Sequence, residues 1–371
     1  MRIIHVADLH LGATLKTNLS EKTRKKRKAE ILSNFDRLAH EAEVGGVSAI
    51  LIAGDLFNAS NISVDVGKSV AAVIKKYPEI DFYYLAGNHD VSGFLNIIDV
   101  IPDNLKLFES DWKSYCLNPD SAGNIKLYGI NFENSNSIIY EDLMPDVKDI
   151  NLVMMHGQIG RNNTSDSPEI INLSKLTGRG IDYLALGHIH SHSGFVDLDI
   201  RGIYCYPGCL EGTGYDECGE HGYVLIDIEE ETGCIDYKFV PFAKRHLYDV
   251  KVDVTGIDNT QDMITKIENE IATKTITSED YLRITLTGTV DVDAFISKPL
   301  IENRFSEDYY SFMVKDSTGI YVDIDSYKND ISLKGEFVRT LMADNTLSED
   351  EKNKLLAMGF RAFTGGNLDE D

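Results

Sequence analysis

Five short polar segments contain residue types that bind metal ions and move protons. They are DLH with Asp8 and His10, GDLFN with Asp55, GNHD with Asn88, His89 and Asp90, MHG with His156, and GHIH with His188 and His190. Each segment lies at or just after the end of a predicted strand, where α/β sheets gather their functional groups. We therefore expect the five segments to meet at one site.

The predicted metal ligands are two carboxylates, one amide and four imidazoles. Asp8 and His10 stand two residues apart, and so do the two histidines of GHIH. In an extended backbone both members of such a pair point to the same side and could hold one ion. Seven ligands suffice for two ions if Asp55 bridges them. The predicted ligands are Asp8, His10, Asp55, Asn88, His156, His188 and His190.

A pair of metal ions is suited to the hydrolysis of phosphate esters. Ions about 3.5–4 Å apart lower the pKa of a bound water and neutralise charge on the attacking and leaving oxygens. Mixed imidazole and oxygen ligands favour Mn, Fe, Co or Zn over Mg or Ca. His89 directly follows the ligand Asn88 and cannot easily share its direction, so we predict that His89 is the general acid and that Asp90 orients it.

Short strands alternate with helical periods over the first two-thirds of the chain, which predicts an α/β sandwich. The strands are expected at residues 2–7, 49–53, 82–85, 126–130, 152–155 and 183–186. Between the first two, Ile31, Phe35 and Leu38 repeat with the spacing of an amphipathic helix. Closely spaced strands near 194–200, 202–205, 222–228 and 235–240 are expected to form an antiparallel layer of the same domain.

A second, smaller α/β domain is predicted after residue 245. Its strands are expected at 248–254, 282–286 and 309–314. Two amphipathic helices follow, the second capped by Ser348 with Glu351 three residues later and ending near Gly359. We divide the chain into a first α/β domain at 1–245, a smaller α/β domain at 246–328 and a helical segment at 329–371.

The charge of the chain is strongly acidic, with 36 Lys and Arg against 60 Asp and Glu, or −24 overall. Such a surface repels nucleic acid as a whole. Basic residues gather only at positions 16–28, KTNLSEKTRKKRK, where a polyanion would bind; the alternative is a solvated helix start. The residues predicted to bind such a polyanion, DNA included, are Lys22, Arg24, Lys25, Lys26, Arg27 and Lys28.

The five scattered cysteines predict reduced thiols in a cytoplasmic protein rather than a disulfide framework. No apolar run approaches the ~18–20 residues of a membrane span. The opening MRIIHVADLH is predicted as a strand, and we expect no secretion signal.

The order DxH, GD, GNHD, H, GHxH resembles the signature of calcineurin-like metallophosphoesterases. The stretches ADLHLG, LIAGDLF, LAGNHD, DYLALGHIH and YPGCLEGTGYDECGEHGY are further similar to DNA double-strand-break repair exonucleases, the nuclease subunit of SbcCD-like complexes. This resemblance covers roughly residues 1–240. It implies that Asp55 bridges the metals and that His89 protonates the leaving oxygen. It assigns Asp8, His10 and His190 to the first metal, and Asn88, His156 and His188 to the second.

The same resemblance implies an activity and partners. We expect Mn-dependent 3′-to-5′ exonuclease action on duplex DNA and endonuclease action on single strands, in DNA repair and recombination. The capping domain follows from the resemblance as well. So do a homodimer and C-terminal helices that dock a separate coiled-coil ABC-type ATPase subunit.

Departures from the family pattern leave alternatives open. Asn58 stands where these nucleases often have His after GDLF, and Cys209 stands where Ser is common and is expected to pack as a small hydrophobe. The acidic charge favours, as an alternative, a phosphoesterase for a small phosphodiester, nucleotide or phosphoprotein. A third alternative is a non-catalytic scaffold, which would have no need to retain all seven ligands and His89.

Overall fold

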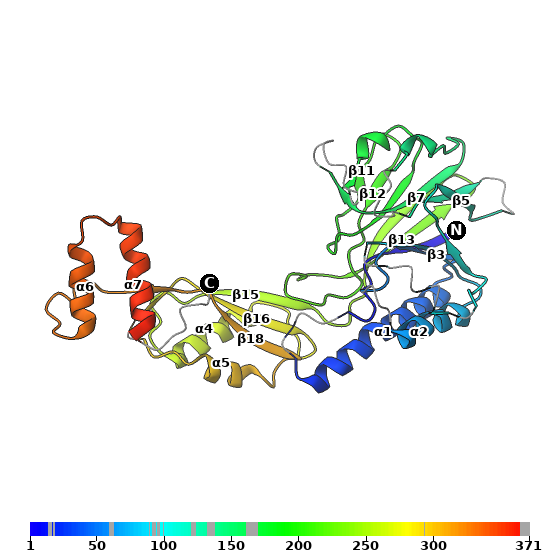
Figure 1. Cartoon of the computed structure of the whole chain (residues 1–371). Coiled ribbons are helices and arrows are strands. Elements are labelled where there is room, and N and C mark those ends of the chain that lie inside the picture. The colour runs from blue at the N-terminus through cyan, green and yellow to red at the C-terminus, as the bar shows by residue number, and fades with distance from the viewer. Residues whose placement is uncertain are drawn as a thin grey trace. The chain divides into compact units, whose positions relative to one another are not determined.

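The chain forms two units, Met1–His246 and Leu247–Asp371 (Figure 1). The structure is a computed structural model. It describes residues 1–13, 17, 19–58, 63–88, 90, 94, 97–98, 100–119, 124–131, 138–160, 170–292 and 294–363.

The first unit is built on two six-stranded sheets, with strand orders β14-β13-β1-β2-β3-β4 and β11-β12-β10-β7-β6-β5. The first sheet contains β1 Arg2–Val6, β2 Ala49–Ala53, β3 Asp81–Leu85, β4 Leu105–Leu107, β13 Gly222–Glu229 and β14 Cys234–Pro241. The second contains β5 Lys113–Cys116, β6 Ile125–Gly129, β7 Ile150–His156, β10 Tyr183–Gly187, β11 Val196–Asp197 and β12 Ile203–Cys205. Strands β1 to β4 run parallel to one another, as do β6, β7, β10 and β12.

Both faces of the central strands are buried, because each sheet is covered on both sides. Between the sheets, side chains such as Leu51, Met154 and Ala185 form one apolar core. Helices α1 (Glu21–Val44) and α2 (Val64–Lys76) lie against the outer face of the first sheet (Figure 1). There the rings of Phe35 and Phe82 lie 6.0 Å apart. The predicted α/β sandwich flanked by helices is confirmed.

The outer face of the second sheet is covered by loops and short elements. These are the 3-10 helices η1 (Tyr140–Asp142) and η2 (Leu173–Lys175) and the small parallel pair β8 (Gln158–Ile159) and β9 (Ile170–Ile171). Their apolar side chains form a second core with the outward residues of β7 and β10.

The strands after His190 form two antiparallel pairs as expected, β11 with β12 and β13 with β14, but the expectation that they form one layer is wrong. Strands β13 and β14 extend the first sheet, where β13 is antiparallel to β1. Strand β12 instead joins the second sheet parallel to β10, with β11 antiparallel at its edge. The connection at 188–202 is long enough for the crossover that the parallel pair of β10 and β12 needs, so the later strands did not have to share one layer.

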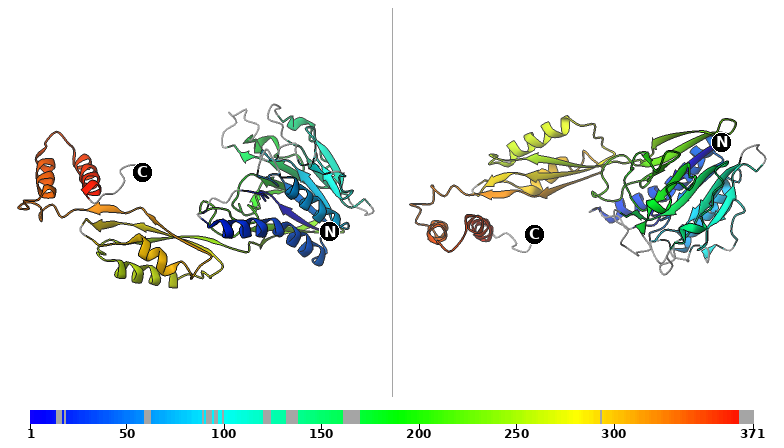
Figure 2. Two further views of the ribbon diagram at one scale, coloured as in Figure 1. Left: turned by 60° about the horizontal axis from the view of Figure 1, so that its bottom comes forward. Right: turned by 90° about the horizontal axis from the view of Figure 1, so that it is seen from above.

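The second unit has a parallel sheet with the order β15-β16-β18. Helices α4 and α5 lie on one face of this sheet (Figures 1 and 2). Its elements are β15 Leu247–Asp253, α4 Thr260–Ala272, β16 Tyr281–Thr287, β17 Thr289–Asp291, α5 Lys298–Phe305, β18 Ser311–Asp316 and β19 Gly319–Tyr321. The side chains between sheet and helices form a core of their own, separate from that of α6 and α7.

The tail forms the two expected helices, α6 (Leu333–Ala343) and α7 (Glu349–Phe363). The capping box at the start of α7 is present, since the Ser348 hydroxyl donates to the Glu351 carboxylate at 2.7 Å and accepts from the Glu351 amide at 3.3 Å. The expected stop near Gly359 is wrong. Gly359 lies inside α7, where a Cβ would stand 2.3 Å from the Phe337 ring, so this glycine permits close packing of the two helices.

None of the described helices combines the length and the apolar character needed to cross a membrane.

Candidate metal centre

The five polar segments meet where parallel strands of the two sheets end. Asp8, Asp55 and Asn88 follow β1, β2 and β3, whose carboxyl ends share one edge of the first sheet. His156 is the last residue of β7 and His188 follows β10, its parallel neighbour in the second sheet. Strand polarity alone therefore brings the segments of each sheet together.

The backbone around these residues is unusual. Among the described residues, the non-glycine residues with positive φ are Asp8 at 53°, His10 at 45°, Asp55 at 51° and His188 at 105°. All four are predicted ligands, and such strain concentrates at functional sites. The reasoning from extended backbone was therefore wrong for both pairs, because their chain turns immediately after the strand.

Two glycines allow the sheets to approach closely at the centre. A Cβ on Gly187 would stand 1.8 Å from the carbonyl oxygen of Ala53, and one on Gly54 would stand 2.1 Å from Nδ1 of His156. Nδ1 of His156 donates to that same Ala53 carbonyl at 2.9 Å. This bond links the two sheets and turns Nε2 of His156 toward the other ligands.

One group of ligand atoms comes from Asp8, His10 and His190, whose nearest donor atoms all lie within 4.8 Å of one another. Nε2 of His10 lies 3.0 Å from Nε2 of His190. The Asp8 carboxylate also accepts from the backbone amide of His188, at 3.0 Å to each oxygen. Asp8 thereby ties the first segment to the last.

A second group lies around His156. Its Nε2 is 2.9 Å from Oδ1 of Asn88, which is 3.4 Å from Nδ1 of His188. Oδ2 of Asp55 is 3.4 Å from Nε2 of His156 and 3.9 Å from Nε2 of His10. The Asp55 carboxylate thus faces both groups, as a bridging ligand must.

The donor set fits divalent metal ions. Asp8 and Asp55 are each 1% exposed and His156 is 3% exposed, whereas Asn88 is exposed. The centre is thus buried at its base and open on one side. Buried carboxylates grouped with imidazoles are costly without a cation to share their charge. The structure therefore brings all seven predicted ligands into two adjoining groups.

Burial and neighbouring charges shift the pKa values of this cluster. Burial raises the pKa of Asp8 to about 7. Burial opposes charge on His156, but the hydrogen bond and charge of Asp55 outweigh it and raise the pKa of His156 to about 9. Shifted pKa values within one cluster of ionisable groups are typical of a functional site. A bound cation would favour the ionised carboxylate and the neutral imidazole.

The two predicted catalytic residues have different outcomes. His89 lies outside the described residues. The carboxylate of Asp90 accepts from the backbone amides of Phe57 at 2.8 Å, Gly87 at 3.0 Å and Leu56 at 3.1 Å. Burial raises its pKa to about 6. Asp90 therefore connects the loop that contains Asp55 to the loop that contains Asn88, a contact that the sequence did not indicate.

The predicted basic surface is the first two turns of α1. Lys22, Arg24, Lys25, Lys26 and Lys28 are exposed there.

Arg27 does not belong to that surface, and its assignment to DNA binding is corrected. It is 0% exposed and donates to Glu211 at 2.6 Å. Arg27 precedes Ile31 by four residues, so it lies on the buried stripe of the helix rather than on its solvent face.

Sequence reasoning also missed two buried acids, Glu211 and Glu217, which are both 6% exposed. Glu217 accepts from Nδ1 of His190 at 2.6 Å. This hydrogen bond raises the pKa of His190. Burial opposes charge on Glu217, but the hydrogen bonds from His190 and Thr213 together outweigh it and hold the Glu217 pKa at about 2. The only signal in the sequence was that Glu211 and Glu217 stand within the glycine-rich run at 206–223.

Cys209 was expected to pack as a small hydrophobe. It is buried, but its Sγ also lies 3.2 Å from Nδ1 of His221.

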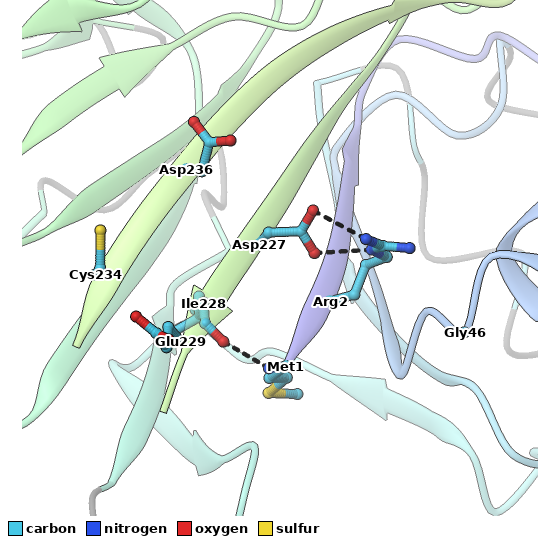
Figure 3. Close-up of a pocket in the computed structure, with 8 residues that line it drawn as sticks. All are labelled: Met1, Arg2, Gly46, Asp227, Ile228, Glu229, Cys234 and Asp236. Carbon is cyan, nitrogen blue, oxygen red and sulfur yellow. Dashed lines mark hydrogen bonds and ion pairs between the residues drawn. The ribbon is translucent and has the colours of Figure 1, made fainter. Parts of the chain in front are cut away.

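A hollow at the other end of β1 is a poor candidate for catalysis (Figure 3). Arg2 donates to Asp227 at 2.7 Å, and the amino group of Met1 donates to the Ile228 carbonyl at 2.6 Å, so its two cations are already engaged. These residues lie at the opposite end of the strand from Asp8, so this hollow is separate from the metal ligands.

Relatives of the chain include proteins of DNA repair. It is 27% identical over 268 residues to the DNA double-strand break repair protein Mre11 of Methanopyrus kandleri, covering 65% of this chain and 56% of that protein. It is 24% identical over 319 residues to the DNA double-strand break repair protein Mre11 of Aeropyrum pernix, covering 80% of this chain and 75% of that protein. It is 26% identical over 272 residues to the metallophosphoesterase YhaO of Bacillus subtilis, covering 70% of this chain and 64% of that protein. The chain thus spans less than two-thirds of the Methanopyrus and Bacillus proteins.

The calcineurin-like phosphoesterase family matches residues 1–192. This range is more than half of the 371-residue chain and contains every predicted ligand from Asp8 to His190. The chain belongs to the calcineurin-like phosphoesterase family.

Proposed function

We propose that the chain is a two-metal phosphodiester hydrolase that acts on DNA. The observation that carries this proposal is the convergence of seven ligand side chains from two sheets, with the Asp55 carboxylate facing both groups. A mononuclear site would not need a carboxylate between two sets of imidazoles.

The residues would divide the work between two ions. Asp8, His10 and His190 would hold the first, and Asp55 would bridge. Asn88, His156 and His188 would hold the second. When bound, the metals would supply a nucleophile at neutral pH and neutralise charge on the phosphate. His89 would give a proton to the leaving oxygen, as its place in GNHD predicts.

The protein groups around the ligands keep them ready for binding. The Ala53 carbonyl holds Nδ1 of His156, so Nε2 is the atom available to a metal. The Asp90 carboxylate holds the backbone amides of Leu56, the residue after Asp55, and of Gly87, the residue before Asn88. The chain therefore supports the site through its backbone as well as its side chains.

DNA is the proposed substrate because two relatives are named DNA double-strand break repair proteins and the start of α1 presents basic side chains. We propose Mn as the metal, with 3′-to-5′ exonuclease action on duplexes and endonuclease action on single strands. On this view residues 1–245 are the nuclease domain and residues 246–328 the capping domain. A homodimer and a cytoplasmic location belong to the same proposal.

The helices at 329–371 are the proposed docking segment for a coiled-coil ATPase subunit. Their apolar side chains support this proposal: Leu333 is 73% exposed, Met358 is 51% exposed and Leu355 is 39% exposed. Large apolar groups exposed on neighbouring helices are typical of a surface that binds a partner.

A small phosphodiester is the second candidate substrate. It is favoured by the net charge of −24 and by the burial of Arg27, which removes one cation from the proposed DNA surface. A small ester needs no basic surface, and its turnover should respond little to salt.

The test compares two substrates and two charge variants. Purified protein with Mn²⁺ is given end-labelled duplex DNA and an aryl phosphodiester. The Lys25→Gln/Lys26→Gln variant should cut DNA cleavage while sparing the small ester. The matched control is Lys68→Gln/Lys75→Gln, which makes the same charge change at exposed positions of α2.

Cleavage of DNA that falls steeply with added salt and falls further in the α1 variant supports the DNA proposal. Hydrolysis of the small ester with intact DNA would overturn the choice of substrate but leave the phosphodiesterase standing. No hydrolysis of either, with metal bound, would overturn both and favour a scaffold.

A further inference from the structure

Both nitrogens of His190 have assigned neighbours. Nε2 lies 3.0 Å from Nε2 of His10, among the proposed ligands of the first metal. Nδ1 donates to Oε1 of Glu217 at 2.6 Å. Glu217 therefore contacts the back of a proposed ligand and lies outside the ligand set.

Glu217 is itself held in place. Its side chain is buried, and its second oxygen, Oε2, accepts from the backbone amide of Thr213 at 2.7 Å and from the Thr213 hydroxyl at 3.0 Å. Its backbone carbonyl accepts from Nε2 of His221 at 2.8 Å. The carboxylate can thus rotate little, and Oε1 is left directed at His190.

The remaining contacts close a ring. Because Nε2 of His221 donates to Glu217, Nδ1 of His221 is an acceptor, and the Cys209 thiol 3.2 Å away donates to it. The backbone amide of Cys209 donates to the carbonyl of His190 at 3.0 Å. Backbone and side chain of His190 are therefore fixed by one hydrogen-bonded loop that includes Cys209, Glu217 and His221.

We propose that Glu217 is a positioning residue that fixes the tautomer and orientation of His190 for the first metal. A carboxylate that accepts from the far nitrogen of a ligating histidine keeps the proton at Nδ1 and leaves Nε2 as the metal-binding atom. This inference rests on the proposed metal site, but it does not depend on DNA being the substrate.

A third metal site does not explain this cluster equally well. The ligand atoms of His190, Cys209 and Glu217 do lie within 4.8 Å of one another. However, Nδ1 of His190 already donates to Glu217, and the Cys209 thiol lies against the acceptor nitrogen of His221. Burial also raises the pKa of Cys209 well above its usual value, which disfavours the thiolate that a metal needs.

The Glu217→Gln variant keeps the size of the side chain but removes its charge and replaces an acceptor oxygen with an NH₂ donor. Thr213 offers two donors to Oε2, so the amide oxygen of Gln would turn toward Thr213 and its NH₂ toward His190. That NH₂ would favour a bare Nδ1 and a proton on Nε2, the atom that must bind metal. We expect the first metal to bind 10–100-fold more weakly, the usual effect of losing such a partner.

The experiment measures Mn²⁺ bound per chain by equilibrium dialysis with elemental analysis, without any substrate. The wild-type chain is expected to bind two ions, and the Glu217→Gln substitution is expected to lower the affinity for only one of them. The matched control is Glu220→Gln, the same change at an exposed position in the same loop. Thr213→Val, which removes only the hydroxyl donor, should give a smaller loss of the same affinity.

Each result bears on a different part of the site. Two unchanged Mn²⁺ affinities in Glu217→Gln would overturn the role of Glu217 and leave the metal site intact. A wild-type chain that binds no Mn²⁺ would overturn the metal site itself. If the affinities for both ions fall equally and the metal-free protein unfolds at a lower temperature, Glu217 only maintains the fold. The milder Thr213→Val variant tests this point if Glu217→Gln does not fold.

Discussion

Replacing Arg27 tests the distinction between the buried stripe and the exposed face of α1. The Arg27 guanidinium is 0% exposed and donates to Glu211 at 2.6 Å. Removing one partner of a buried ion pair costs about 3–5 kcal/mol. In Arg27→Met the aliphatic volume is largely kept, and Glu211 still accepts from Asn34 at 2.6 Å and from the Arg245 amide at 3.0 Å. We therefore expect the lower end, about 3 kcal/mol.

For a unit of this size, that loss corresponds to a fall in unfolding temperature of roughly 6–12 °C. The single tryptophan, Trp112, lies in the first unit, so its fluorescence reports the unfolding of that unit by heat or urea. The control is Lys25→Met, which removes an exposed ion pair with Glu21 and should cost less than about 0.5 kcal/mol. Equal stability of the two variants, with DNA binding lost only in Arg27→Met, would refute the reasoning.

Three further predictions concern the site and its supports. Gly187→Ala should abolish phosphodiester hydrolysis and weaken Mn²⁺ binding, because the added Cβ would meet the Ala53 carbonyl at 1.8 Å; unchanged turnover would contradict the close packing of the sheets. Chelation with EDTA should stop hydrolysis and lower the unfolding temperature, both restored by Mn²⁺, and activity that survives full metal removal would exclude metal-dependent chemistry. Glu30→Gln should reduce the dependence of stability on acid. Burial opposes the charge of Glu30, but hydrogen bonds and the charge of Arg245 hold its pKa at about 2. Its stabilisation is full above the ordinary pKa of 4.5 and is lost as pH falls toward 2. The difference in unfolding temperature between wild type and Glu30→Gln should therefore become smaller from pH 5 to pH 3. A constant difference would contradict a stabilising ion pair between Glu30 and Arg245.

The sequence predicted much of what strand order and residue type determine. The ligand segments follow strands whose ends are marked by apolar runs and glycines, so a common edge could be expected before any geometry was known. The stripe through Ile31, Phe35 and Leu38 correctly predicted the covering helix. These features depend on local periodicity, which a single sequence displays directly.

Features that depend on contacts between distant segments could not be predicted. The partners of Arg27 and His190 are Glu211 and Glu217, which lie 184 and 27 residues further along the chain. The turned backbone at Asp8 and Asp55 likewise depends on the amide–carbonyl bonds between their loops, such as Asp8 to Gly54 at 3.1 Å. Spacing alone suggested an extended chain there.

The local sequence also does not show which sheet each of the later strands joins. Strands β12 and β13 are both rich in apolar residues, yet one pairs with β10 and the other with β1. The connection between them sets which edge each can reach, and its path is determined by packing against residues far away in sequence.

The most direct test of the central claim is the anomalous diffraction of Mn²⁺ bound to crystals of the protein. Two peaks about 3.5–4 Å apart are expected. One should be bound by Asp8, His10 and His190, and the Asp55 carboxylate should lie between the two. A single peak, or two peaks away from Asp55, would contradict the dinuclear centre.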